Sequence, residues 1–527
     1  MATTKTEPIG TWDTFHKNGP FHLDNLHTTR LEGPGNLPGI LNRYNDAAAE
    51  IQRLIGQAAA LGQGFRAYGS AWSLSDIPHH PDNMHYNGFM NLKLAIRPEN
   101  LHTETAFSAP NLFFFQCGNR IKEISEYLYD HGKSLKTTGA SNGQTIAGAI
   151  STGVHGSAID VGAVQDYVVG LNLITGPNPE DVVYLERASA PALNDAFAAG
   201  INARVIRDDA LFNAALVGLG AFGFIHGVAL EAEDVFLLKR YVKKIPKAAA
   251  LDLALHLDDP ARPFEIAGIP ENGRRPFHYK IFLNPYSDEE EYVVEAMYKK
   301  PYRPDYPSPI PFIRTAVYRD LIVLFAKVIE RFPKTIPKLV KLLQGQVLPE
   351  VDAELEGPLK DIFWDAPNLG AVFAVSVGIS HKDAARASEL LVQLARDEGP
   401  VPGIYAMRFV KASGATLACT RFPFTCMLEM DGVQWKKSRK IMGPDKFYRR
   451  ILEVLKANDI PFTLHWGKNA AWDFPNLAAH MYGPDAQTWM AQRSTLLSPA
   501  MAQVFSNPFL RRVGLDGAQF GRKAPIT

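Results

Sequence analysis

The sequence predicts a mixed fold of helices and strands that is divided into more than one substructure. The chain has 527 residues, which is too long for one small hydrophobic core. Apolar runs typical of buried strands, such as residues 111–116 (NLFFFQ), alternate with segments in which apolar residues recur at helical spacing. A glycine-rich segment, residues 137–156, interrupts this pattern and is typical of neither element.

The charge balance and the cysteine content narrow the classes of function. Lys and Arg together number 55, as do Asp and Glu, so we expect neither a nucleic-acid partner nor membrane contact. The first residues lack the apolar region of a secretory signal, and no run is long enough to span a bilayer, so we expect a cytoplasmic protein. The three cysteines, Cys117, Cys419 and Cys426, indicate neither a disulfide scaffold nor a zinc site, so we expect buried thiols and no bound metal.

The first half of the chain contains helices and strands in alternation. Residues 1–40 carry aromatic residues without clean periodicity and are expected to wrap around a domain. A helix is predicted over residues 47–61, where apolar residues recur at helical spacing until Gly62. The strand at residues 111–116 leads into a predicted helix over residues 121–128. Further strands are predicted over residues 166–174 and 181–185, and a helix followed by a strand over residues 208–232.

The composition changes near Asp234, where glycine becomes rarer, and we predict a domain boundary there. Further along, an apolar helical face that includes Leu321 and Ile322 ends at Pro333, and an amphipathic piece with Lys334, Lys338 and Lys341 follows. A buried helix pair is the preferred interpretation, and a basic surface facing lipid or an apolar substrate is the alternative. Strands are predicted over residues 277–283, 371–379, 405–410 and 424–430, and helices near residues 390–396 and 447–455.

Residues 137–156 (TTGASNGQTIAGAISTGVHG) indicate a bound ligand. They combine glycines, alanines and small polar side chains with a single histidine, His155, and contain no Lys, Arg or carboxylate. Glycine allows the backbone to approach a ligand closely, and successive backbone N–H groups can hold anionic oxygens such as those of a pyrophosphate. A surface linker, the alternative, would be polar throughout, whereas Ile146 and Ile150 are apolar.

Two other glycine positions have the same character. Gly69 and Ser70 form a predicted turn at the end of a short strand, where backbone N–H groups and the hydroxyl of Ser73 could bind a phosphate. The alternative is an ordinary turn that binds no ligand, which would show the same pattern. Gly223 also permits a close backbone approach.

Four motifs in this chain point to one family. They are GSAWS from Gly69, QTIAGAISTGVHG from Gln144, GLGAFGFIHGVAL from Gly218 and HWGK from His465. In this order they resemble the vanillyl-alcohol-oxidase (PCMH-type FAD-binding) flavoenzyme superfamily, and within it the aldonolactone oxidase and alditol oxidase branch. The flavin-dependent sterol oxidases are looser relatives. The resemblance is strongest over residues 40–235 and weak over residues 240–400.

The resemblance implies an α+β fold with FAD as cofactor. Residues 1–234 would form a two-lobed FAD-binding domain, and residues 235–464 a substrate domain with a large antiparallel sheet flanked by helices. Residues 465–527 would return to the FAD domain. The implied cofactor-binding residues are Gly69, Ser70, Ala71, Trp72 and Ser73 at the pyrophosphate; Ser141, Gln144, Thr145, Gly148, Thr152 and Gly156 along the rest of the flavin; and Gly223, Phe224 and Ile225 at the adenine end. His155 would be either a structural histidine, the preferred role, or a group beside the flavin.

One departure from the family concerns the attachment of FAD. Many members of this branch carry a histidine in the GS-x-H-S turn that bonds covalently to the flavin, and here that position is Trp72. An indole offers no comparable nucleophilic nitrogen, so covalent attachment through this turn is excluded. We therefore expect non-covalent FAD.

The resemblance also implies catalytic residues. Alcohol oxidation by hydride transfer to the flavin needs a group that takes the hydroxyl proton or stabilises the alkoxide, and cations where negative charge accumulates. The related oxidases supply a Glu-x-Arg pair on a substrate-domain strand and the lysine of His-Trp-Gly-Lys. Here Arg408 and Lys468 match, but Ala406 stands at the position of the carboxylate. Arg408 would stabilise an oxyanion, and Lys468 would place an ammonium at the ring edge.

Three residues are candidates to replace the missing carboxylate, namely Glu429, Tyr405 and His465. Glu429 lies in TCMLEMD and is either a pocket carboxylate or the outward-facing residue of an alternating strand, and we prefer the outward position. A surface position is also the alternative for Arg408, whereas aromatic neighbours favour a partly buried Lys468.

These features predict an FAD-dependent oxidoreductase that oxidises a CH–OH donor of alcohol, polyol or lactone type. Molecular oxygen is the expected acceptor, giving hydrogen peroxide. The alternative is a dehydrogenase using another acceptor or a biosynthetic enzyme acting on a bulkier apolar substrate; a flavin protein with a decayed site would also explain Ala406. The substrate, the acceptor and the oligomeric state are open at this point.

Overall fold

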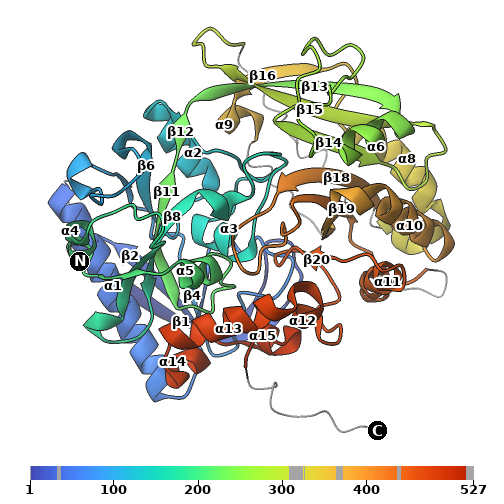
Figure 1. The fold of residues 1–527 in the computed structure, drawn as a ribbon. Helices are drawn as coiled ribbons and strands as arrows, with labels where there is room; N and C mark the ends of the chain where they lie inside the picture. Colours follow the sequence, from blue (N-terminus) through green and yellow to red (C-terminus); the bar gives the residue numbers. More distant parts are fainter. Residues whose placement is uncertain are drawn as a thin grey trace.

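The computed structural model of the protein describes residues 2–32, 37–307, 325, 327–363, 372–435 and 441–517. Within these residues, two sheets and their helices occupy one side of the molecule and a large sheet occupies the other (Figure 1). Leu321 and Ile322, which belong to the predicted helix pair, lie outside the described residues.

The N-terminal hairpin belongs to a four-stranded sheet of order β1-β2-β4-β3. β1 (Ala2–Trp12) and β2 (Phe21–Leu31) pair antiparallel, and β2 runs parallel to β4 (Asn83–Tyr86), which also pairs with β3 (Arg66–Tyr68). The expectation that residues 1–40 wrap a domain is therefore wrong. Few side chains of the hairpin are buried, so backbone pairing stabilises it without the apolar alternation that marks a half-buried strand.

A six-stranded sheet of order β10-β9-β8-β11-β6-β5 completes the first half. Helix α3 emerges from the glycine-rich segment and ends at Gly153, whose φ of 72° is left-handed. The strands are β5 (Lys93–Ala95), β6 (Leu112–Gln116), β8 (Val168–Ile174), β9 (Val182–Glu186), β10 (Arg204–Arg207) and β11 (Phe224–Glu231), with β7 (Lys133–Ser134) and β12 (Glu233–Asp234) as a separate pair. The helices are α1 (Leu37–Ala60), α2 (Ile121–Asp130), α3 (Ile146–Thr152), α4 (Asp195–Gly200) and α5 (Asp209–Leu216).

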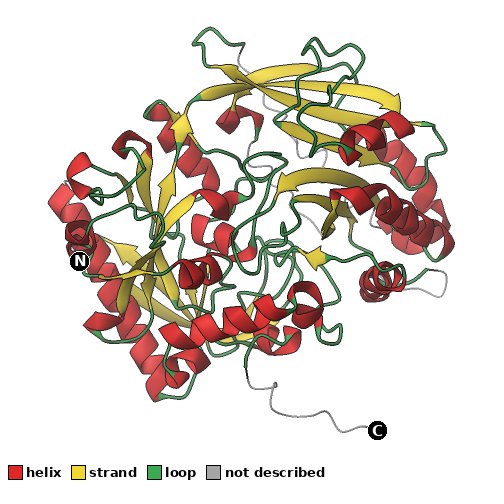
Figure 2. Cartoon of the chain, in the orientation of Figure 1, coloured by secondary structure: helices red, strands yellow, loops and turns green. Residues whose placement is uncertain are grey.

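The second half contains an antiparallel sheet of order β16-β13-β15-β14-β18-β19-β17-β20, eight strands within the described residues. This sheet and its helices confirm the predicted mixed fold with a large antiparallel sheet (Figure 2). The strands are β13 (Phe236–Pro246), β14 (His278–Leu283), β15 (Glu291–Pro301), β16 (Glu354–Pro358), β17 (Val372–Ser380), β18 (Gly403–Lys411), β19 (Phe424–Val433) and β20 (Thr463–Leu464). The helices are α6 (Lys247–Leu255), α8 (Ile336–Val347), α9 (Leu359–Ile362), α10 (Ala384–Asp397) and α11 (Pro444–Ala457).

Strand β18, near the middle of the large sheet, is buried on both faces. Tyr405, Met407 and Phe409 of β18 belong to the hydrophobic core that includes residues of α6, α10 and α11. Ala406 and Arg408, on the opposite face of the same strand, line a cavity shared with the first half of the chain. Polar side chains on that face are therefore enclosed, not exposed to bulk water.

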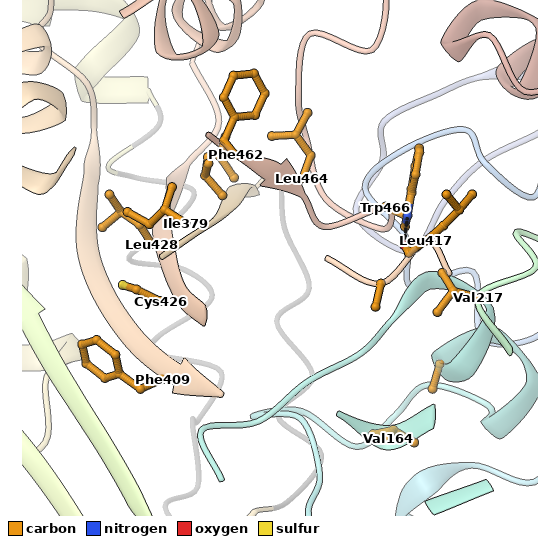
Figure 3. Packing of buried hydrophobic residues seen from close by; sticks show 14 of the residues in the cluster. Val164, Val217, Ile379, Phe409, Leu417, Cys426, Leu428, Phe462, Leu464 and Trp466 are labelled. Atoms are coloured by element: carbon orange, nitrogen blue, oxygen red, sulfur yellow. Dashed lines mark hydrogen bonds between the residues drawn. The ribbon is translucent and has the colours of Figure 1, made fainter. Parts of the chain in front are cut away.

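The C-terminal segment joins the two halves. Figure 3 shows Phe462 and Leu464 beside Ile379 on the side of the large sheet, while Trp466 lies beside Leu417 and Val217. Beyond it lie α12 (Leu477–Tyr482), α13 (Pro484–Leu496), α14 (Pro499–Val504) and α15 (Pro508–Val513), of which α13 packs on α5. The domain limits remain a prediction.

Three further observations concern membranes, metals and thiols. None of the described helices is long and apolar enough to cross a bilayer. The part of the chain that the structure describes contains no cluster of three or more potential metal ligands. The three cysteines are unpaired and buried, as predicted.

Candidate active site

One cavity of about 1380 Å³ lies between the loops of the first half and the large sheet. A pocket for one small molecule usually measures about 300–1,000 Å³, so this cavity has room for a large cofactor and a second ligand. All the residues that the sequence predicted at the cofactor, and Arg408, Glu429 and Lys468, contribute to its lining.

The turn after β3 and the start of α3 form one wall of the cavity. Gly69 packs on Thr145, the N-cap residue of α3, so closely that a Cβ would collide with the threonine side chain. Ala71 has a left-handed φ of 52°, which turns the chain at this point. A Cβ at Gly148 would meet only Thr145 Oγ1, at 3.3 Å, and otherwise find open space. The two glycine-rich loops thus form a single wall with room for a ligand against Gly148.

This wall fits FAD by its unpaired polar atoms. The side-chain oxygens Oγ of Ser70 and Oε1 of Gln144 are buried and have no hydrogen-bond partner among the described residues. Buried polar atoms are normally paired, so these atoms indicate a polar ligand. Gly223 and Phe224, at the start of β11, lie at the cavity with Gly223 at a φ of 103°. Their roles toward the cofactor remain predictions.

The HWGK motif is hydrogen-bonded to the same wall. The backbone N–H of Leu74 donates to the carbonyl of Gly467 at 2.8 Å, and the hydroxyl of Ser75 donates to the carbonyl of Trp466 at 2.7 Å. A Cβ on Gly467 would lie 3.5 Å from Ser73 Oγ. These contacts hold Lys468, which follows in the chain, at the edge of the cavity.

Two buried histidines face each other beside this loop. The rings of His155 and His465 have centroids 5.4 Å apart. Nδ1 of His155 donates to the carbonyl of Gly156 at 3.0 Å, and Nδ1 of His465 accepts from the N–H of Gly467 at 3.0 Å. Burial lowers the pKa of His155 to about 4 and the pKa of His465 well below its usual value, so both rings are neutral. These partners leave the lone pair of His155 on Nε2.

Trp72 is held by the N-terminal hairpin connection. Its ring stacks on Phe15 at a centroid distance of 4.6 Å, and His16 lies edge-on to it at 5.8 Å. His16 lines the cavity, and burial together with the charge of Lys468 lowers its pKa to about 4. No sequence pattern marks His16, because residues 13–20 lie outside any recognisable element.

The large sheet supplies the opposite wall and corrects one prediction. Ala406 of β18 is directly opposite Glu429 of β19 in the antiparallel register. Glu429 Oε2 lies 2.9 Å from Arg408 Nε, in an ion pair without an aligned hydrogen bond. The preferred outward position of Glu429 is wrong, and so is a surface position for Arg408: their side chains are 5% and 10% exposed. The alternation of β19 does separate Glu429 from Leu428, but the second face is covered by the first half of the chain.

The surrounding charges keep Glu429 ionised. Burial by itself raises the pKa of Glu429, but the positive charges of Arg408, Lys468 and Lys280 lower it more strongly, to about 2. A carboxylate therefore lies beside Arg408 on the neighbouring strand, opposite Ala406.

The sequence reasoning missed several polar and charged residues on the same face of the sheet. These are Arg240, His278, Lys280, Glu295 and Asp431, all of which line the cavity. The sequence FHYKIFL (residues 277–283) does indicate a strand with one polar face, because His278 and Lys280 alternate with Tyr279 and Ile281.

Sequence comparisons identify relatives of this chain. The models of known protein families give no match. The chain is 25% identical over 473 residues to L-gulono-1,4-lactone dehydrogenase of Mycobacterium tuberculosis. The aligned region covers 88% of this chain and 94% of that protein. It is 34% identical over 148 residues to L-gulonolactone oxidase 3 of Arabidopsis thaliana, or 28% of this chain and 21% of that protein. With D-arabinono-1,4-lactone oxidase of Candida albicans it shares 28% identity over 194 residues, or 36% of this chain and 31% of that protein.

Solved structures share the fold. A solvent-stable cholesterol oxidase superimposes with a TM-score of 0.68 at 14% identity, over 96% of this chain and 97% of that chain. Cholesterol oxidase from Brevibacterium sterolicum superimposes with a TM-score of 0.65 at 15% identity, over 97% of each chain. These relatives and solved structures agree with the predicted resemblance to the vanillyl-alcohol-oxidase superfamily of FAD-dependent oxidoreductases. The superfamily and the α+β fold with a large antiparallel sheet are thus confirmed.

Proposed function

We propose that this superfamily member oxidises the CH–OH group of an alcohol, polyol or lactone with non-covalently bound FAD, and passes the electrons to molecular oxygen to give hydrogen peroxide. The observation that carries this proposal is the Arg408–Glu429 ion pair, which faces the glycine-rich loops across the cavity. An intact charged pair at this place also speaks against a decayed site.

FAD, when bound, supplies the chemistry by accepting a hydride from the carbon of the donor. Arg408 would hold the donor oxygen, because a guanidinium is a permanent cation and stabilises negative charge that develops on that oxygen. Glu429 Oε2 lies 2.9 Å from Nε of Arg408, so it would fix the orientation of Arg408. Lys468 would place a second positive charge at the cavity edge, where it could balance charge on the cofactor.

The hydroxyl proton needs a neutral acceptor, and His155 is suited to that role. Its Nδ1–H is committed to the carbonyl of Gly156, which leaves Nε2 free to accept. His465 has the opposite arrangement, because its Nδ1 accepts from Gly467 and its proton is on Nε2. This assignment gives His155 a role beside the cofactor in addition to a structural one.

Specific observations favour alternatives for the electron acceptor and for the donor. The relative that spans most of this chain is named a dehydrogenase, which favours an acceptor other than oxygen. The outer cavity is lined by Val340, Leu348, Val351 and Leu355, which favours a bulkier, less polar donor. Both alternatives keep the same hydride transfer from a CH–OH group.

The experiment is anaerobic mixing of the purified holoprotein with a panel of alcohols, polyols, aldonolactones and sterols, followed by admission of air. Bleaching of the flavin absorbance by a CH–OH donor, with hydrogen peroxide on reoxidation, is expected. Bleaching without peroxide would favour the dehydrogenase. If dithionite reduces the flavin but no member of the panel does, the proposed reaction is wrong.

A further inference from the structure

A row of charged side chains crosses the cavity face of the large sheet. Arg240 of β13 has Glu295 of β15 at 3.8 Å, and Arg408 has Glu429 at 2.9 Å. Lys280 of β14 lies between these pairs and makes neither a hydrogen bond nor an ion pair with any residue that the structure describes. Its Nζ lies over the Phe282 ring at 4.4 Å from the centroid, which supports the cation without neutralising it.

The position of Lys280 in the sheet is unfavourable without a further group. In the register of β14 and β18, Lys280 is directly opposite Arg408, and its other cross-strand neighbour is Glu295. Like charges directly opposite each other in an antiparallel pair are destabilising. Burial, followed by the charge of Arg408, lowers the pKa of Lys280 to about 8, although Glu429, Glu295 and Asp431 act in the opposite direction. An anionic group beside Lys280 would relieve both effects.

A second observation on the same face points to a ligand. His278 lies two residues before Lys280, is 2% exposed, lines the cavity, and its Nε2 has no hydrogen-bond partner among the described residues. Nε of Arg240, across β15 from His278, is likewise buried and without a partner in the described part of the chain. Nζ of Lys280, Nε2 of His278 and Nε of Arg240 therefore line one part of the cavity without a hydrogen-bond partner among the described residues, although another nitrogen of Arg240 is ion-paired with Glu295. Buried polar atoms are normally paired.

We propose that Lys280, with His278 and Arg240, forms a subsite for an anionic oxygen group of the substrate, so that the donor is an alcohol that also carries a carboxylate, sulfate or phosphate. This inference rests on the proposed function, because it describes the donor of that reaction. The group would lie on the sheet beside Arg408, and the hydroxyl would be held by Arg408 itself. A charged group at Lys280 would fix the orientation of the donor carbon in the cavity.

The test uses the holoprotein and matched donors. We would compare an ω-hydroxycarboxylate with the α,ω-diol of the same length, and with the sulfate and phosphate monoesters of that diol, in anaerobic flavin reduction. A charge-assisted hydrogen bond predicts half-saturation at about 10- to 100-fold lower concentration for the favoured anion than for the diol. Lys280→Met should abolish this ratio and Lys280→Arg should largely keep it. Lys411→Met, an exposed lysine at the end of β18, is the matched control.

A binding measurement separates this inference from the reaction. Calorimetric titration of the oxidised holoprotein with the unreactive alkanoate of the same length should show saturable binding in the wild type, and a loss of about 10-fold or more in affinity in Lys280→Met. Affinity should decline above pH 8 in the wild type but not in Lys280→Arg, since only lysine loses its charge there; Arg408, Glu429, Glu295 and Asp431 are the charged groups around it.

The outcomes are distinct. If diol and anions reduce the flavin at the same concentrations, or if Lys280→Met leaves their ratio unchanged, the subsite does not exist although the reaction does. If no donor reduces the flavin but the alkanoate binds through Lys280, the anion subsite stands and the proposed reaction falls. If the alkanoate and the corresponding alkyl sulfate and alkyl phosphate all fail to bind to the folded, FAD-loaded wild type, the inference is overturned.

Discussion

The register of the large sheet allows mutations to move the carboxylate beside Arg408 from β19 to β18. Ala406 and Glu429 are cross-strand partners, and directly opposite Cβ atoms in an antiparallel pair are about 5 Å apart. Residue 406 also lies two positions before Arg408 on the same face of β18. We therefore expect the double variant Ala406→Glu, Glu429→Ala to present a carboxylate to Arg408 from its own strand.

The cost of removing Glu429 follows from its ionisation. The pKa of Glu429 is lowered from 4.5 to about 2, and each unit corresponds to about 1.4 kcal/mol, so the attraction of Arg408, Lys468 and Lys280 for the carboxylate, after the cost of burial, contributes on the order of 3 kcal/mol. The loss of one partner from a buried pair typically costs about 3–5 kcal/mol, which agrees. Because the folded pKa is depressed, this stability is present above pH 4.5 and is lost as the pH falls toward 2.

These magnitudes set the expected results for three variants. Glu429→Ala should lower the thermal midpoint and slow anaerobic flavin reduction by about 100-fold, because Arg408 loses its orientation. The double variant should recover at least about 10-fold of that rate if half of the interaction is restored. Ala406→Glu alone is the control, and it should be destabilised because two carboxylates would face each other. If Glu429→Ala reduces its flavin at the wild-type rate, or if the double variant recovers nothing while remaining folded and yellow, the pairing of Glu429 with Arg408 is not what supports catalysis.

Other predictions concern the cofactor and the charges around it. Acid precipitation should release free FAD into the supernatant, because Trp72 cannot form a histidyl bond; flavin that stays with the polypeptide would contradict this. Gly148→Val should abolish FAD retention, since a Cβ there projects into open cavity space. Unchanged flavin absorbance after gel filtration would show that FAD does not bind against Gly148. Lys468→Met should slow flavin reduction by about 100-fold or more with little loss of FAD, whereas Arg408→Ala should also weaken donor binding; stopped-flow half-saturation distinguishes them. Burial raises the pKa of Asp166 from 3.8 to about 6, so its contribution to stability is lost as pH rises between these values; thermal midpoints of Asp166→Asn should lack that dependence.

Much of the fold was predictable because several of its strands bury both faces and its helices bury one. The apolar runs at residues 277–283 and 424–430 correspond closely to β14 (His278–Leu283) and β19 (Phe424–Val433). The hairpin of β1 and β2 was not predictable, because its strands are joined by backbone hydrogen bonds and bury few side chains. Periodicity reports burial, so an element stabilised mainly by pairing gives a weak signal.

The parts of the site that need a glycine for close backbone approach were predictable from the sequence. The parts that depend on how neighbouring strands pair were not. Gly69, Gly148 and Gly223 could be placed at one cavity, because close approach to a ligand needs the absence of a Cβ. Glu429 was misplaced, since the alternation of one strand identifies two faces but not which of them another part of the chain covers. The pairing of residue 429 with residue 406 is a long-range property of the sheet that no local pattern contains.

The most direct test of the central claim is the visible absorbance of the purified protein, recorded anaerobically before and after addition of CH–OH donors. A flavin spectrum that is bleached by a donor in the wild type, and bleached far more slowly in Arg408→Ala at equal FAD content, is the expected result. A colourless protein that takes up no added FAD, or a flavin that every such donor leaves oxidised while dithionite reduces it, would contradict the assignment of this cavity as the active site of an alcohol-oxidising flavoenzyme.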